Sequence, residues 1–75
     1  MAKVSIKADV VRDQLVRRNL SQNHLALKAH ISRGYLSQLL HGERCPGPDV
    51  RRRLMSALRI KEFDELFDYL PEPGA

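Results

Sequence analysis

Apolar residues recur at helical spacing in five separate segments of this 75-residue chain. Residues three and four positions apart lie on one face of an α-helix, so each segment predicts a short helix with one apolar face. The first predicted helix covers about residues 8–18, the second and third lie within residues 21–40, the fourth starts at residue 48, and the last covers about residues 62–70. The pattern predicts an all-α fold.

The second and third helices are joined by a very short connection. Ser21 and Ser32 each precede a run with helical apolar spacing. A serine at that place can accept a free N–H group of the first helical turn, so both residues are predicted N-caps. Only residues 29–31 separate the two runs. Two short helices that each have one apolar face and are joined by a tight turn form a helix-turn-helix.

The outer face of the third helix carries side chains that are suited to reading DNA bases. Arg and Gln can form two hydrogen bonds with one base edge in the major groove. Arg33 and Gln38 are therefore the main candidates for base readout, with Ser37 beside them. Ser32 and Gly34 are expected at the floor of the groove, where a glycine allows the backbone to approach DNA closely.

A second set of side chains is expected to contact DNA phosphates. Gln22 is at the first position of the second helix, where free N–H groups and the positive helix end favour an anion. We also expect the Tyr35 hydroxyl, on a half-buried ring, and Arg44, where the chain leaves the groove, to contact phosphates. Phosphate contact and stabilisation of a helix C-terminus both remain open for three further residues: Arg17, Arg18 and His41.

Residues 20–42 resemble the lambda-repressor/Cro-like (XRE) family of DNA-binding domains. The resemblance rests on the following positions: Leu20, Ser21, Gln22, Leu25, Ala26, Ser32, Leu36, Ser37, Leu39 and Gly42. With the flanking helices, it covers about residues 9–70. The resemblance implies a compact bundle of about five helices with the third helix in the major groove of DNA.

One pair of positions departs from the pattern of this family. Many members form an ion pair between an Arg of the first helix and a Glu near the end of the third. Leu15 and Leu40 occupy these positions here. A buried ion pair is often no more stabilising than packed apolar side chains. We therefore expect the two leucines to touch in the core without loss of the fold.

The domain is expected to span residues 9–70, because 75 residues can build only one core. Residues 1–8 carry Lys3 and Lys7. They are expected to form either an arm that contacts DNA phosphates or a short extended piece laid on the core. Residues 71–75 are expected to be a flexible tail.

Charge is divided unevenly along the chain. Residues 1–61 contain all 13 Lys and Arg residues and four acidic residues, whereas residues 62–75 contain five acidic residues and no basic one. A basic body suits binding to a polyanion, with the acidic end held away from the phosphates. The simpler alternative is an ordinary solvated surface.

The last predicted helix combines apolar and acidic side chains. Its apolar positions repeat at helical spacing: Phe63, Leu66, Phe67 and Leu70. We expect them to close the core, and an exposed part of this stripe is the candidate dimer interface. The acidic remainder of the helix is a candidate docking site for a protein partner.

Other kinds of chemistry find little support in the sequence. The three His residues lack metal-ligand spacing and the single Cys cannot form an internal disulfide, so no metal site is expected. The chain has no glycine-rich phosphate loop and is too short for a substrate pocket, so neither catalysis nor a cofactor is expected. Neither a membrane span nor a signal peptide is present. These features suit a cytoplasmic, nucleoid-associated protein of a prokaryote or phage.

Taken together, these features predict a sequence-specific, double-stranded DNA-binding transcriptional regulator. The simplest form is a repressor that binds a two-fold symmetric operator as a homodimer. The alternative is a protein-interaction module, such as an antitoxin-like partner, that uses the acidic last helix.

Overall fold

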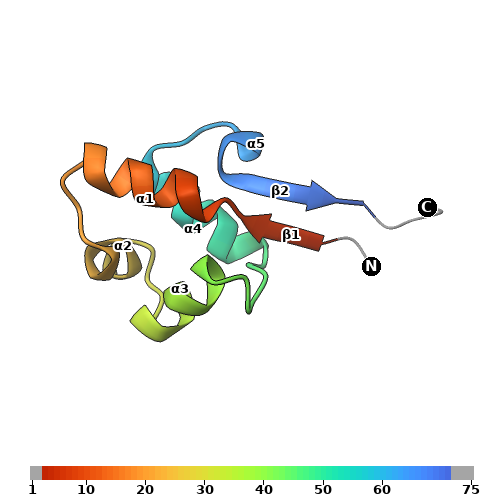
Figure 1. Cartoon of the computed structure of the whole chain (residues 1–75), viewed down its shortest axis with the longest axis horizontal. Coiled ribbons are helices and arrows are strands. Elements are labelled where there is room, and N and C mark those ends of the chain that lie inside the picture. Colours follow the sequence, from red (N-terminus) through yellow and green to blue (C-terminus); the bar gives the residue numbers. More distant parts are fainter. Residues whose placement is uncertain (1–2, 72–75) are drawn as a thin grey trace.

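The computed structural model describes residues 3–71 and contains five helices and two short strands (Figure 1). Their order is β1 (Lys3–Ile6), α1 (Ala8–Arg17), α2 (Gln22–Lys28), α3 (Arg33–Leu40), α4 (Pro48–Leu58), α5 (Phe63–Leu66) and β2 (Phe67–Leu70). The mostly helical fold with five helices is as predicted, whereas the strand pair was not predicted. Parts of the expected arm and tail, residues 1–2 and 72–75, lie outside the described residues.

Both helices of the helix-turn-helix begin at the predicted caps. The Ser21 hydroxyl accepts a hydrogen bond from the backbone N–H of His24 at 3.1 Å, and the Ser32 hydroxyl accepts one from the N–H of Tyr35 at 3.0 Å. Each bond satisfies an N–H group that the helix itself leaves unpaired, and such a cap contributes about 0.5–2 kcal/mol. The two serines therefore fix where α2 and α3 start.

Helices α1 to α4 all end in the same kind of turn. A residue with left-handed backbone follows each of them: Asn19 (φ 55°), His30 (φ 56°), Gly42 (φ 78°) and Arg59 (φ 53°). The next N–H then donates to a carbonyl five residues back, as from Leu20 to Leu15 at 2.9 Å. This Schellman arrangement satisfies carbonyl groups that a helix end leaves unpaired. It explains how five helices fit into so short a chain, because each turn needs few residues.

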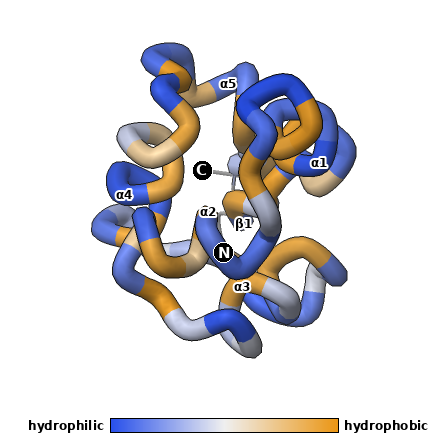
Figure 2. Tube along the Cα trace, turned by 90° about the vertical axis from the view of Figure 1, so that its left-hand side faces the viewer, coloured by the Kyte–Doolittle hydropathy of each residue, from blue (hydrophilic) through white to orange (hydrophobic). Residues whose placement is uncertain are grey.

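The apolar faces of the helices meet in a single core, which Figure 2 shows as hydrophobic positions on the inner side of the trace. The buried side chains are Ile6, Val11, Leu15, Leu25, Ala26, Ala29, Leu36, Leu39, Leu40, Leu54, Leu58, Ile60, Leu66 and Phe67. Val50 and Ala57 of α4 are partly buried against this core. Leu15 and Leu40 are both buried in it, and direct contact between them remains a prediction.

The last helix is shorter than predicted. α5 ends at Leu66, and Phe67 has extended backbone with φ −129° and ψ 148°. Strand β2 then pairs antiparallel with β1, with Ile6 opposite Phe67. The prediction of one helix over residues 62–70 was therefore wrong. The apolar spacing of so short a segment does not distinguish a helix from a strand. The hydrogen bonds to β1 decide for a strand, and they cannot be predicted from the spacing within residues 62–70.

This strand pair also changes the expected dimer interface. Leu66 is 0% exposed and Phe67 is 1% exposed, so both belong to the core and neither is available to a second chain. Phe63 is partly buried, and its ring lies 5.2 Å from that of Phe67 between centroids. Of the four predicted interface residues, Leu70 alone is largely exposed, at 66%.

The N-terminal segment is extended and lies on the core. This is one of the two forms expected from the sequence. Ile6 is buried beneath the helices. The Lys7 ammonium donates a hydrogen bond to the backbone carbonyl of Asp64 at 2.7 Å and lies 3.9 Å from the Asp68 carboxylate. Lys7 therefore joins the start of the chain to its acidic end.

Candidate nucleic-acid interface

The exposed start of α3 is the centre of the candidate interface. Ser32, Arg33 and Gly34 are all exposed to solvent. Because Ser32 caps the helix, Arg33 is its first helical residue. Among the described residues, the Arg33 guanidinium has no hydrogen-bond or ion-pair partner. An unpaired cation at the accessible start of a helix is free to meet an external hydrogen-bond acceptor.

Gly34 is not required by the fold of the free protein. A Cβ atom at this position meets nothing within 4 Å. A glycine inside a helix is less favourable than alanine by about 0.8–1 kcal/mol, although less in the first turn. Gly34 therefore leaves open space beside the backbone, which an external partner can approach closely.

Ser37 and Gln38 lie further along α3 and are both half-buried. The Ser37 hydroxyl is within hydrogen-bond distance, 3.3 Å, of Nδ1 of His41. This contact orients the exposed imidazole at the end of the helix. Gln38 is five residues after Arg33, which places it about 140° around the helix. Gln38 therefore lies on a flank of α3, whereas Arg33 marks its tip.

The other predicted phosphate-binding residues surround the helix-turn-helix. Gln22 is the first residue of α2, which packs against α3. Tyr35 is half-buried against the core, as predicted, and its ring is thereby held in place. Arg44 is exposed in the loop between α3 and α4. These three residues therefore come from both helices and from the loop that follows them.

Arg17 and Arg18 lie at the end of α1, apart from α3, and phosphate contact by them remains a prediction. Figure 1 shows the end of α1 at the upper left, whereas the start of α3 is at the lower edge of the molecule. Arg17 donates a hydrogen bond to Asp13 at 2.7 Å, and this bond and the carboxylate charge raise the pKa of Arg17 above its ordinary value. Arg18 donates to the side-chain oxygen of Gln14 at 3.1 Å.

Sequence reasoning missed one residue that supports the interface. The Arg53 guanidinium on α4 donates a hydrogen bond to the backbone carbonyl of His30 at 3.0 Å. His30 lies in the turn between α2 and α3. Arg53 therefore holds the turn that sets the position of α3. No local pattern could have indicated this role, because the two residues are 23 positions apart.

A helix-turn-helix on a mostly helical bundle defines a class of DNA-binding proteins. The family model described as Helix-turn-helix matches residues 11–66. An uncharacterized HTH-type transcriptional regulator, YvzC of Bacillus subtilis (strain 168), is 37% identical to this chain over 67 residues, which are 89% of this chain and 86% of that protein. No solved structure is significantly similar.

The chain belongs to the XRE family of helix-turn-helix DNA-binding transcriptional regulators. This family is not a class of enzymes. Within residues 3–71, no helix has the length and apolar character needed to cross a membrane. The same residues contain no group of three or more His, Cys, Asp or Glu side chains that could hold a metal ion.

Proposed function

We propose that this protein is a repressor that binds operator DNA as a homodimer and reads the major groove with α3. The exposed start of α3 is the observation that carries the proposal. It combines a capped helix end, an unpaired Arg33 and a Gly34 whose open side faces solvent. This arrangement suits a helix whose first residues approach base edges.

The contacts divide into two kinds in this proposal. Arg33 and Gln38 read bases, while Ser32, Gly34 and Ser37 line the contact with the groove. Four residues bind phosphates and set the position of α3 on the duplex: Gln22, Tyr35, His41 and Arg44. Phosphate contacts supply affinity for any sequence, whereas base contacts supply preference for one sequence.

The homodimer is proposed to form through the end of β2. Tyr69 and Leu70 are neighbours on this strand and are 55% and 66% exposed. Their side chains project to opposite faces of the strand, and exposed large apolar side chains are candidates for a surface that is covered in an assembly. Tyr69 and Leu70 therefore replace the buried Leu66 and Phe67 as the proposed contact.

One experiment tests the proposed function as a whole. DNA sites bound by the protein are selected from a random pool, and the stoichiometry of the complex with the best site is then measured. We expect two half-sites about one helical turn, 34–36 Å, apart and two chains for each site. Selection of no common sequence contradicts sequence-specific binding, and one chain on a symmetric site at saturation contradicts the homodimer.

The alternative of a protein-interaction module loses its main support. It was based on an acidic amphipathic helix over residues 62–70, but α5 has only four residues and the apolar side chains of Leu66 and Phe67 are buried. A partner that grips a helix face needs an exposed apolar stripe of several turns. The region between Phe63 and Leu70 offers no such helix.

A further inference from the structure

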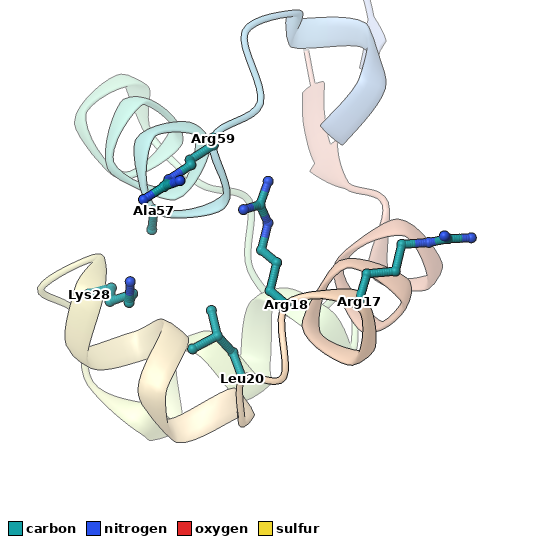
Figure 3. A pocket seen from close by; sticks show the side chains of 6 residues that line it. All are labelled: Arg17, Arg18, Leu20, Lys28, Ala57 and Arg59. Carbon is teal, nitrogen blue, oxygen red and sulfur yellow. The ribbon is translucent and has the colours of Figure 1, made fainter.

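A hollow of about 360 Å³ lies between the C-terminal ends of α1, α2 and α4, outside the candidate nucleic-acid interface (Figure 3). Its lining residues are Arg17, Arg18, Leu20, Lys28, Ala57 and Arg59. Four of these six side chains are cationic and none is acidic. The chain thus gathers cations from three separate helices around one concave surface.

Within residues 3–71, three of the four cations have no counter-ion. In Figure 3, Arg17 points away from the hollow, toward the side where it pairs with Asp13. Arg18 bonds only to the neutral amide of Gln14. Among the described residues, Lys28 and Arg59 form no ion pair. Arg18, Lys28 and Arg59 therefore surround the hollow with positive charge that an anion could neutralise.

Helix ends bring these cations together. Each cation is near a helix C-terminus, where a positive charge is favourable. Arg59 has a left-handed backbone, with φ 53°, as Asn19 and His30 do at the ends of α1 and α2. Glycine is the usual residue in such a turn, so it can replace Arg59 without backbone strain. The anion-binding role that we assign to Arg59 therefore rests on its place beside the hollow.

We propose that this hollow, named here the α1–α2–α4 pocket, binds the phosphate group of a small phosphorylated molecule. The guanidinium group of arginine can donate two parallel hydrogen bonds to two phosphate oxygens. The ammonium group of lysine adds a compact positive charge on a flexible side chain. The volume is at the lower end of the range of small-molecule sites. The neighbouring Leu20 and Ala57 offer an apolar wall for the rest of such a molecule.

The pocket extends along α2 from one end to the other. Leu20 lies just before this helix and Lys28 is its last residue. Gln22, a proposed phosphate contact, is the first residue of the same helix. Competition with DNA therefore has to be measured to distinguish a small anion in the pocket from a phosphate of the DNA backbone.

The proposal is tested by titrating the full-length free protein with pyrophosphate at constant ionic strength and following backbone and guanidinium NMR signals. Saturable shifts at Arg18, Lys28 and Arg59 are expected. R59G and K28Q should each weaken binding at least tenfold, and R59G should fold well because glycine suits the backbone there. R12Q is the matched control, because Arg12 is exposed on α1 outside the pocket; it should change the affinity less than twofold.

Two results overturn the proposal. The first is non-saturable binding, or equal weakening by R12Q and R59G, since both indicate general charge attraction. The second is competition between pyrophosphate and DNA together with weaker DNA binding by R59G, which assigns the pocket to the DNA backbone. The pyrophosphate titration of the free protein stands even if the proposed operator binding fails, so the two proposals are tested separately.

Discussion

Single residues in this protein differ in how far their roles can be recognised from the sequence. The serine caps and the left-handed Asn19 and Gly42 could be recognised from sequence, because capping and glycine turns depend on immediate neighbours. Arg53 could not be recognised, because its partner, the His30 carbonyl, is remote in sequence. Local chemistry is therefore predictable here, whereas tertiary contacts of surface cations are not.

Gly34 allows a test of whether the backbone at the start of α3 approaches DNA closely. G34A should leave the stability unchanged or raise it by up to about 1 kcal/mol, because alanine favours the helix and its Cβ meets no atom of the protein. The affinity for operator DNA should fall, because the methyl group fills space needed at the groove floor. Urea unfolding and a DNA titration give the two values. Unchanged DNA affinity would show that the backbone at residue 34 does not approach DNA closely.

Arg53 provides a second test. R53Q should lower the free energy of unfolding by about 0.5–1.5 kcal/mol, the usual value of a hydrogen bond that is accessible to water. The control is R52Q, because Arg52 is exposed and pairs with Asp49 on its own helix; it should cost less than about 0.5 kcal/mol. Hydrogen exchange at residues 29–32 should also become faster in R53Q. Equal effects of both variants would contradict the tie between α4 and the turn.

At the scale of elements, the helices follow the sequence pattern and the strands do not. Apolar spacing located the inner faces of α1 to α4 because each helix buries a face defined by its own period. The end of the chain escaped prediction because Phe67 takes its backbone partner from β1. Isolated short helices have marginal stability in water. Pairing with another part of the fold can therefore decide whether such a segment forms a helix or a strand.

The burial of Leu40 on α3 gives a prediction for the stability of the fold. L40A should destabilise the protein by about 2–5 kcal/mol, because Leu40 is buried in the core. The midpoint of urea unfolding measures this change. L27A is the control, because Leu27 is 72% exposed and its truncation should cost little. A loss below about 0.5 kcal/mol in L40A would mean that the side chain does not contribute to the core.

The whole molecule separates its charges. Many of its cations lie on the helices, while the acidic residues of α5 and β2 are exposed beside the strand pair, where Lys7 ties the two ends of the chain together. This separation was visible in the sequence, but the α1–α2–α4 pocket was not. Its cations come from positions 17–59, and only the packing of three helix ends brings them together.

Operator binding should therefore depend strongly on salt. Each phosphate that the protein neutralises should lower log K by about 0.9 for each unit of log salt concentration. R44A should reduce this slope by about one, because Arg44 is an exposed cation that we assign to a phosphate. Titrations at several salt concentrations give the slopes. A flat affinity between low and moderate salt would contradict binding to the DNA backbone.

The central claim is that Arg33 at the start of α3 reads a base. The most direct measurement compares the sites that wild-type protein and R33A select from the same random DNA pool. If Arg33 reads a guanine, R33A keeps its fold but loses preference at one position of each half-site, with about 1–3 kcal/mol less discrimination there. If R33A keeps the full sequence preference and binds all sites more weakly with a lower salt slope, Arg33 binds a phosphate and the claim is wrong.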